Sequence, residues 1–276
     1  MKKGSQNGVS VRKVDEPKTL DDYRKAFLNL LPNVSPSYDL RSIFCDACRI
    51  FCLSFRGVIA SGKEKDEIER EYQTFLEKYG NDGMQKISIL LSYVVQALEL
   101  RRSDFLGHVQ EGINATRGKD AGQFYTPDSV SVMMARMCAM GQEVKPGRII
   151  KIGDPSCGAG ALLIAGVEAL MDVGVRQGDV LVSGEDLDPT ACNIFYVQAT
   201  LLGYAAIVTR MDSLSMQVYE GPWYTIGYFA HCMPMRIMCE AVKEESSEEQ
   251  MPQEKKPEEP VKEINVRDLV QGEFNF

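Results

Sequence analysis

The sequence lacks any run of 18 or more apolar residues, the length that a membrane-spanning helix needs. Its first 19 residues are polar, so they do not contain the apolar segment of a secretory signal peptide. These two absences predict a cytoplasmic protein without a membrane partner. The eight cysteines are then expected to be reduced thiols rather than a disulfide framework.

Clustered lysine and arginine are also missing. The formal net charge is −8, and residues 241–276 carry −5 of it, which leaves −3 for the rest of the chain. Binding to nucleic-acid phosphates needs a basic patch, so this chain is not expected to bind DNA unaided. The apolar fraction of 44% is ordinary for a chain that buries a core.

Residues 20–115 have the spacing of amphipathic helices. Aromatic and aliphatic residues recur at intervals of three and four over Tyr72–Tyr79, and again over Ile87–Leu98. Between them, Gly80–Gly83 is a turn signal. The pattern predicts an α-helical N-terminal domain over 20–115, preceded by a flexible N-terminus over 1–19.

Short apolar runs alternate with helical stretches after residue 115. The expected strands are Ile149–Gly153, Val180–Gly184, Ala205–Thr209 and Thr225–Ala230, and the expected helices are 127–140, 159–173 and 190–202. This alternation implies a parallel sheet with right-handed crossovers. We therefore predict an α/β domain over 116–240 with about four strands, and a disordered acidic linker with a C-terminal peptide over 241–276.

The segment Ile150–Gly160 reads as a strand, a glycine-rich turn and the start of a helix. Glycines there allow positive φ angles and close approach of a ligand to the backbone. The unpaired N–H groups of a helix start favour an anionic group. Taken alone, the pattern fits equally well a plain strand-to-helix turn with a glycine cap.

Acidic residues follow the next two expected strands. Asp186 stands where nucleotide-binding folds hold a ribose diol, because a carboxylate accepts both hydroxyl hydrogen bonds. The alternative is a solvated turn that caps the next helix, and we assign that capping role to Asp188. Asp212, after the third strand, is positioned to accept from the exocyclic amine of an adenine ring.

Five segments, in this order, resemble the N6-adenine-specific DNA methyltransferases, and most of all the modification subunit of type I restriction systems. They are Asp104–Glu111, Gly122–Pro127, Asp154–Gly160, Gly184–Pro189 and Asp212–Leu214. The resemblance covers roughly residues 104–228. It implies a Rossmann-like S-adenosylmethionine-dependent methyltransferase sheet, S-adenosyl-L-methionine as the cofactor, and DNA methylation in restriction-modification as the function.

The resemblance also implies eight cofactor-binding residues, which are Phe124, Thr126, Pro127, Asp154, Gly158, Gly160, Asp186 and Asp212. In the family pattern the aromatic residue packs on or beside the adenine ring, and the Thr-Pro pair lines the methionine end. The first aspartate and the two glycines hold the amino-acid part. The last two aspartates bind the ribose and the adenine amine.

The family's catalytic motif is Asn or Asp, then Pro-Pro, then Tyr or Phe, at the end of the fourth strand. Its polar side chain binds the target amine, and its aromatic ring stacks on the flipped base. This sequence has no Pro-Pro pair, and Cys232, Pro234 and Met235 stand at the expected place. A thiol substitutes poorly for an amide, and methionine has no flat stacking face. We therefore assign no catalytic residue and expect a protein that is catalytically impaired alone.

The expected sheet has four strands where the family has seven, so Thr225–Ala230 would form an open edge that the N-terminal helices or a second polypeptide covers. Two alternative functions follow. One is an active adenine DNA methyltransferase completed by a second methyltransferase or specificity subunit. The other is a non-enzymatic interaction protein that docks a sliding clamp through Gln271–Phe276, whose aromatic residues resemble the anchors of clamp-binding peptides.

Two groups of cysteine and histidine invite a metal interpretation. Cys45, Cys48 and Cys52 lie in the apolar segment Leu40–Phe55, where packing in the core is favoured over a zinc site that needs a fourth ligand. The group His231, Cys232 and Cys239 lacks a standard ligand spacing. We expect no metal.

Two single residues complete the candidates. Trp223 is expected to pack the loop that enters the fourth strand, with stacking on a base as the alternative. His108 is expected at the surface of a polar helix.

Overall fold

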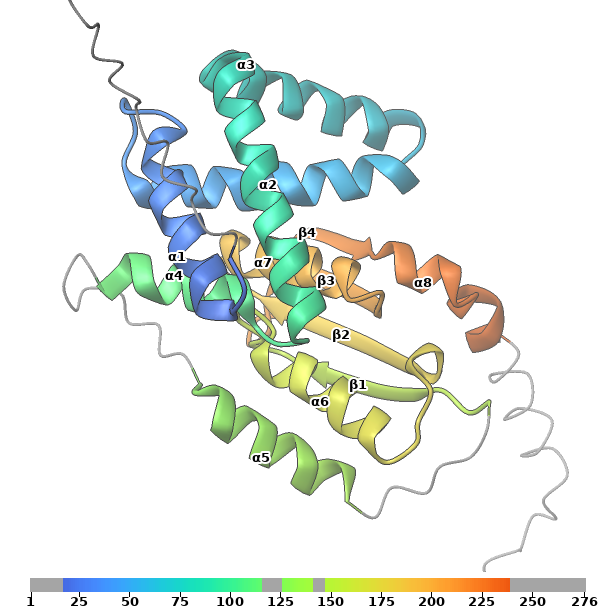
Figure 1. The fold of residues 1–276 in the computed structure, drawn as a ribbon. Helices are drawn as coiled ribbons and strands as arrows, with labels where there is room; N and C mark the ends of the chain where they lie inside the picture. Colours follow the sequence, from blue (N-terminus) through green and yellow to red (C-terminus); the bar gives the residue numbers. More distant parts are fainter. Residues whose placement is uncertain (1–16, 116–125, 141–146, 239–276) are drawn as a thin grey trace, which may run out of the picture. The chain divides into compact units, whose positions relative to one another are not determined.

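The computed structural model describes residues 17–115, 126–140 and 147–238 (Figure 1). Its helices are α1 (Leu20–Leu30), α2 (Leu40–Ile59), α3 (Gly62–Leu100), α4 (Phe105–Ala115), α5 (Asp128–Ala139), α6 (Ala161–Asp172), α7 (Pro189–Leu201) and α8 (Ile226–Ala230), with short 3-10 turns at Leu31–Asn33 and Gln177–Asp179. Its strands are β1 (Ile150–Asp154), β2 (Val180–Asp186), β3 (Ala205–Asp212) and β4 (Gln217–Tyr224). No helix of this part of the chain is long and apolar enough to cross a membrane.

The predicted helical N-terminal region is confirmed. Thr19 opens α1 with a capping box, since its side chain accepts from the Asp22 N–H while the Asp22 carboxylate accepts from the Thr19 N–H. The turn predicted at Gly80–Gly83 is a kink inside α3, where Gly80 takes φ 62° and ψ −179°. The N-terminal residues 1–16 and the predicted acidic linker with its C-terminal peptide, from residue 239 on, lie outside the described residues.

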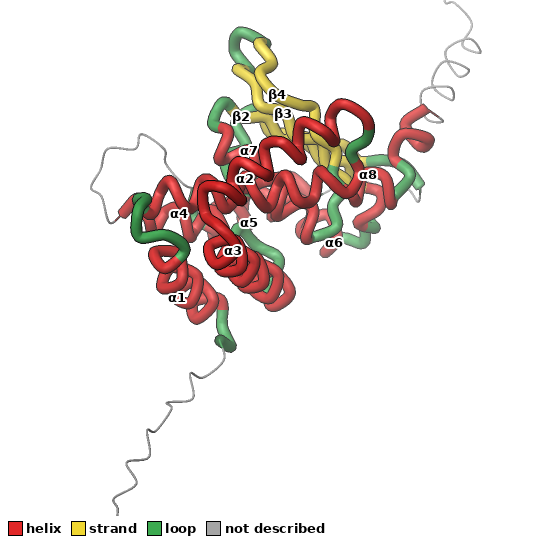
Figure 2. The backbone as a smooth tube through the Cα atoms, turned by 90° about the horizontal axis from the view of Figure 1, so that it is seen from above, coloured by secondary structure: helices red, strands yellow, loops and turns green. Residues whose placement is uncertain are grey.

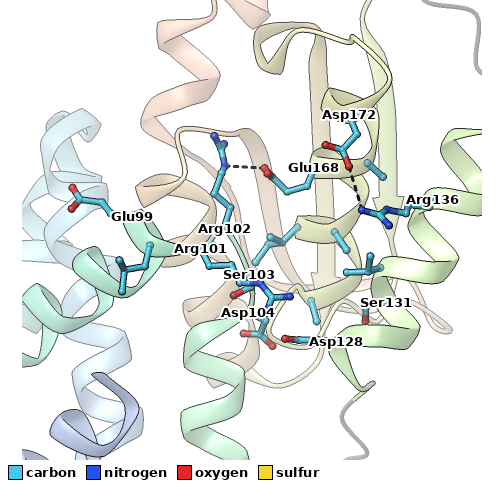
Figure 3. A pocket seen from close by; sticks show the side chains of 16 residues that line it. Glu99, Arg101, Arg102, Ser103, Asp104, Asp128, Ser131, Arg136, Glu168 and Asp172 are labelled. Atoms are coloured by element: carbon cyan, nitrogen blue, oxygen red, sulfur yellow. Dashed lines mark ion pairs between the residues drawn. The ribbon is translucent and has the colours of Figure 1, made fainter. Parts of the chain in front are cut away.

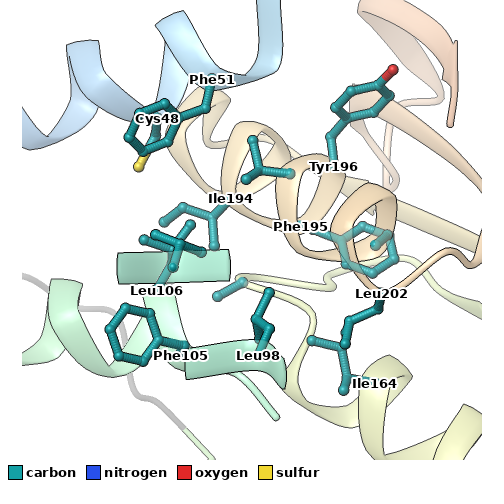
Figure 4. Close-up of a cluster of buried hydrophobic side chains, with 14 of the residues drawn as sticks. Cys48, Phe51, Leu98, Phe105, Leu106, Ile164, Ile194, Phe195, Tyr196 and Leu202 are labelled. Atoms are coloured by element: carbon teal, nitrogen blue, oxygen red, sulfur yellow. The ribbon is translucent and has the colours of Figure 1, made fainter. Parts of the chain in front are cut away.

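One hydrophobic core joins the N-terminal helices to the α/β region. Figure 4 shows Cys48 and Phe51 of α2 with Phe105 and Leu106 of α4 around the same cluster as Phe195 of α7. The predicted core packing is confirmed for Cys48 and Cys52, which are both 0% exposed. Burial raises the pKa of the Cys52 thiol to about 12, so this thiol stays protonated and serves as a small apolar group.

The α/β region is built on three parallel strands in the spatial order β1-β2-β3. Helix α6 connects β1 to β2, and α7 connects β2 to β3, as expected for crossovers between parallel strands. This arrangement corresponds to the 3-2-1 half of a doubly wound sheet. The predicted fold class, an incomplete Rossmann-like α/β sheet with a helical N-terminal region, is confirmed.

The fourth strand differs from the prediction. Residues Thr225–Ala230 do not form a strand, because Thr225 caps α8 and its side chain accepts from the Tyr228 N–H. The fourth strand is β4, and it pairs antiparallel with β3, as the hairpin in Figure 2 shows. The sheet of the described residues is therefore mixed, with β1 and β4 at its edges.

The N-terminal helices cover β4. Arg49 of α2 forms an ion pair with Glu220 of β4 at 3.2 Å between Nη1 and Oε2, and its guanidinium also binds Glu71 of α3. Trp223 lies within β4 rather than in a loop, is 4% exposed, and has the Arg56 guanidinium 4.6 Å from its ring centroid. Its packing role is confirmed, and its burial rules out stacking on an incoming base.

Candidate functional site

The glycine-rich loop lies where three parallel strands end. β1 ends at Asp154, directly before the loop, and β2 and β3 end at Asp186 and Asp212. Because these strands run parallel, all three carboxylates lie at the same edge of the sheet, its carboxyl edge. Ligands of doubly wound sheets bind at this edge. The fold thus brings together three of the residues that the sequence predicted from separate segments.

The ends of β2 and β3 hold the loop in place by hydrogen bonds. The Cys157 N–H donates to the Glu185 carbonyl at 2.9 Å, and the Gly158 N–H donates to Asp186 Oδ2 at 2.8 Å. From the end of β3, the Ser213 hydroxyl donates to the Pro155 carbonyl at 2.6 Å. These bonds fix the backbone conformation before any ligand arrives, which is the preorganisation that a binding site needs.

The two glycines of the loop serve different physical purposes. Gly160 has φ 89°, and a Cβ there would lie 2.1 Å from Cδ2 of Phe195, so only glycine lets α6 begin this close to α7. Gly158 has φ 54°, and a Cβ there would meet no atom within 4 Å. The space in front of Gly158 is therefore open to a ligand, whereas the space at Gly160 is filled by the protein.

Asp186 is half-buried and already binds backbone on both sides. Oδ2 accepts from the Gly158 N–H, and Oδ1 accepts from the Asp188 N–H at 2.9 Å. A carboxylate has about four acceptor positions, so two of them remain for the hydroxyls of a diol. Asp188 caps α7 by accepting from the Thr190 N–H at 2.8 Å, which confirms its predicted capping role.

Asp154 and Asp212 form tight local turns. Asp154 Oδ1 accepts from the Ser156 N–H at 2.9 Å. Asp212 Oδ1 accepts from the Leu214 and Ser215 N–H groups. Hydrogen bonds from the Ser215 side chain and from these N–H groups lower the pKa of Asp212, so it stays ionised and able to accept at neutral pH.

The upstream part of the predicted site is described only in part. Phe124 lies outside the described residues. Thr126 and Pro127 are exposed at the start of α5, where the Pro127 carbonyl accepts from the Val130 and Ser131 N–H groups. Helix α5 packs on α6, the helix that begins at the loop.

Two residues at the carboxyl edge were not predicted as site residues from the sequence. Ser213 donates a hydrogen bond to the loop, and Leu187 is 55% exposed beside Asp186.

The residues expected to replace the catalytic motif lie at the other end of the strands. Next to Cys232, the His231 ring contacts the Gly203 carbonyl before β3, and Arg236 binds Asp179 Oδ1 at 2.6 Å and the Gly178 carbonyl before β2. This is the amino edge of the sheet. With about 3.3 Å per residue along a strand, the seven-residue β2 separates the two edges by roughly 20 Å.

That position corrects the expectation that Cys232, Pro234 and Met235 end a fourth parallel strand beside the cofactor loop. The chain turns back as β4 instead, and α8 then leads to the amino edge. Cys232 takes a positive φ of 55°, and Met235 is 69% exposed. Both residues therefore lie near the amino edge of the sheet, away from the loop at its carboxyl edge.

A cavity of about 490 Å³ lies between the end of α3, α5 and α6 (Figure 3). Ion pairs join Arg102 to Glu168 at 2.8 Å and Arg136 to Asp172 at 3.7 Å across its wall. Asp104 and Asp128 also line it, whereas Gly158, Asp186 and Asp212 do not. His108, which was expected at the surface, is 24% exposed and bonds to Asp128 Oδ1 at 2.8 Å through Nε2.

Residues 101–215 match the family model described as N-6 DNA methylase. The match contains the loop and all three aspartates of the carboxyl edge, and it ends before β4. The family that the five sequence motifs predicted is thereby confirmed for this stretch.

One curated relative is the methylase subunit of the type I restriction enzyme MjaIX of Methanocaldococcus jannaschii. It is 28% identical to this chain over 119 residues, which are 42% of the chain and 20% of the relative. The match thus spans about a fifth of that relative's length.

Two solved structures align with part of this chain. The methyltransferase subunit of a type I restriction-modification system from Streptococcus thermophilus aligns with a TM-score of 0.41 at 15% identity, covering 71% of this chain and 59% of that one. A class I S-adenosylmethionine-dependent methyltransferase from Listeria monocytogenes aligns with a TM-score of 0.43 at 17% identity, covering 73% and 57%.

Proposed function

We propose that this protein binds S-adenosyl-L-methionine at the carboxyl edge of its sheet and is an N6-adenine DNA methyltransferase-like protein of restriction-modification type that does not transfer the methyl group alone. The observation that carries the proposal is the loop held at Cys157 and Gly158 by the strand that ends in Asp186. The match of residues 101–215 to the N-6 DNA methylase family model supports this choice of cofactor.

The residues present fit the cofactor. Open space in front of Gly158 admits a ligand against the backbone. Gly160 has no side chain to cap α6, so the N–H groups of the first turn could bind the carboxylate of a ligand. Asp186 retains acceptor positions for a ribose diol, and Asp212 is an ionised acceptor one strand further along.

When bound, S-adenosylmethionine supplies a methyl group on a positively charged sulfur. The chain's own residues bind and orient it: the α6 start binds the carboxylate, Asp186 the ribose and Asp212 the adenine amine. Phe124, Thr126 and Pro127 remain proposed contacts of the adenine and methionine parts. We assign no group that would orient a target amine toward the methyl group, since the family's motif has no counterpart in the sequence.

The test is a transfer assay with S-adenosylmethionine carrying a tritiated methyl group and DNA rich in adenine. The proposal predicts radioactivity that stays with the protein on filters and none in the DNA. Labelled N6-methyladenine produced by the purified chain would contradict the claim that it is impaired alone. Labelling only after a second methyltransferase or specificity subunit is added would support the alternative of an enzyme completed by a partner, with DNA and that subunit as partners.

The sliding-clamp alternative rests on residues 271–276, which lie outside the described residues.

A further inference from the structure

Gln198 of α7 is a fully buried amide in the middle of an otherwise apolar helix face. Its Oε1 accepts from the N–H groups of Phe105 at 2.8 Å and Leu106 at 3.0 Å. Its Nε2 donates to Asp104 Oδ1 at 2.9 Å and to the Ala159 carbonyl at 3.0 Å. A glutamine amide has two donors and two acceptor positions, so all four are used.

On one side, this network caps α4. Phe105 and Leu106 are the first two residues of that helix, and their N–H groups have no partner within it. Asp104, which is 5% exposed, completes the cap because its Oδ1 accepts from the Gly107 N–H at 2.8 Å. Gln198 thereby connects α7 to the last helix of the N-terminal region.

On the other side, the same amide holds the glycine-rich loop. Ala159 lies between Gly158 and Gly160, so fixing its carbonyl restricts both glycines. The tethers at Pro155, Cys157 and Gly158 come from the ends of β2 and β3. The hydrogen bond to the Ala159 carbonyl comes instead from Gln198 of α7, and the same amide also binds the first N–H groups of α4. A buried polar network with every member satisfied specifies one arrangement of its surroundings.

We propose that Gln198, oriented by Asp104, is a positioning residue for the cofactor site: it sets the Ala159 carbonyl and couples occupation of the site to the start of α4. This inference deepens the proposed function and rests on it. It concerns no group that touches the reacting atoms. Its consequence is that the N-terminal helices take part in cofactor binding without touching the cofactor.

The main test compares Gln198→Met with the matched control Gln177→Met. Gln177 also makes several amide hydrogen bonds, to the Leu202 and Gly203 carbonyls and from Arg102, but it is only partly buried and lies away from the loop. With both variants folded by circular dichroism, we expect Gln198→Met to lower the affinity for S-adenosylmethionine at least tenfold and Gln177→Met to change it less than twofold. Equal affinities in the two variants would overturn the proposal.

Gln198→Glu provides a second readout that a purely structural role would not give. The carboxylate still accepts from the N–H groups of α4, but it has no donor for the Ala159 carbonyl or for the Asp104 carboxylate that it faces. Protonation restores one donor, so the affinity of this variant is expected to rise as the pH falls from 8 to 5, relative to the wild type. An affinity ratio that stays constant over this range would overturn the proposal.

Amide hydrogen exchange separates a failure of the tether from a failure of cofactor binding. In the absence of any cofactor, the Cys157 and Gly158 amides are expected to exchange at least tenfold faster in Gln198→Met than in Gln177→Met. If the wild type binds no S-adenosylmethionine, the proposed function fails, and the exchange experiment still decides on the tether. Equal exchange rates in the two variants would refute the tether.

Discussion

The two edges of the sheet differ in how their residues are held and in what they offer a ligand. At the carboxyl edge, the backbone around Gly158 is fixed by three neighbouring segments and leaves open space in front of the glycine. At the amino edge, the Arg236 guanidinium donates hydrogen bonds to Asp179 and to the Gly178 and Gly147 carbonyls, so it binds the protein itself. The comparison teaches that the carboxyl edge, and not the amino edge, has the fixed backbone and the open space that the proposed cofactor site requires.

The largest expected effect comes from Gly160→Ala. The new Cβ would lie 2.1 Å from the Phe195 ring at a φ of 89°, so overpacking and backbone strain together should lower the free energy of unfolding by about 3 kcal/mol. Urea denaturation measures this. Gly158→Ala is the matched control, because its Cβ meets no atom, and it should cost only about 1 kcal/mol. Equal losses in the two variants would contradict the different purposes of the two glycines.

Asp186→Ala removes the acceptor of the Gly158 N–H and of a ribose diol. Hydrogen bonds to a charged group contribute about 2 kcal/mol, so the affinity for S-adenosylmethionine should fall roughly 30-fold. Gly158→Asp, which places a charge where the backbone meets the ligand, should also weaken binding. Calorimetric titration measures both. Asp172→Ala, an exposed aspartate at the end of α6, is the control that should bind normally.

An unchanged affinity in both Asp186→Ala and Gly158→Asp would refute the assignment of the site. A loss in Asp172→Ala of the same size would show that the effect is not local to the carboxyl edge.

Much of this edge was predictable because its signals are local. A glycine-rich turn after a strand and an aspartate at each of the next strand ends are visible in the sequence itself. The fourth strand was not predictable in this way. The composition of Thr225–Ala230 suits a strand. Thr225 instead bonds to Ala206 of β3 and to Tyr204 just before it, and it caps a helix. The role of Gln198 was not predictable either. The sequence shows only a single amide in an apolar helix, and the partners of that amide lie more than 35 residues away.

Asp104 should make stability depend on pH. Burial is the main cause that raises the pKa of its carboxyl from 3.8 to about 6, against hydrogen bonds from Gln198 and Gly107 that lower it. Because the folded pKa exceeds the unfolded one, the folded state gains stability as the pH falls from about 6 toward 4. Asp104→Asn keeps an acceptor without the charge, so it should be more stable than the wild type by about 2 kcal/mol at pH 7.5.

This difference should vanish near pH 3, below the ordinary pKa of 3.8, where the wild-type carboxyl is protonated in both states. Urea denaturation of the two proteins at both pH values measures it. A variant that is less stable than the wild type at pH 7.5 would show that the carboxylate is a net stabilising group there.

The smallest expected effect is at the amino edge. Replacing Cys232 by Asn and Met235 by Tyr restores two residue types of the catalytic motif, but roughly 20 Å from the loop by the strand rise. The double variant should transfer no methyl group to DNA and should bind S-adenosylmethionine like the wild type. Methyl transfer by this variant would contradict the separation of the two edges.

The most direct test of the account is a calorimetric titration of the purified full chain with S-adenosylmethionine, with S-adenosylhomocysteine as the unreactive comparison. The account predicts one site with a dissociation constant near 1 μM, which corresponds to about 8 kcal/mol, for a chain that leaves DNA unmethylated. No binding heat for either ligand at millimolar concentration would contradict the central claim that the carboxyl edge is a cofactor site.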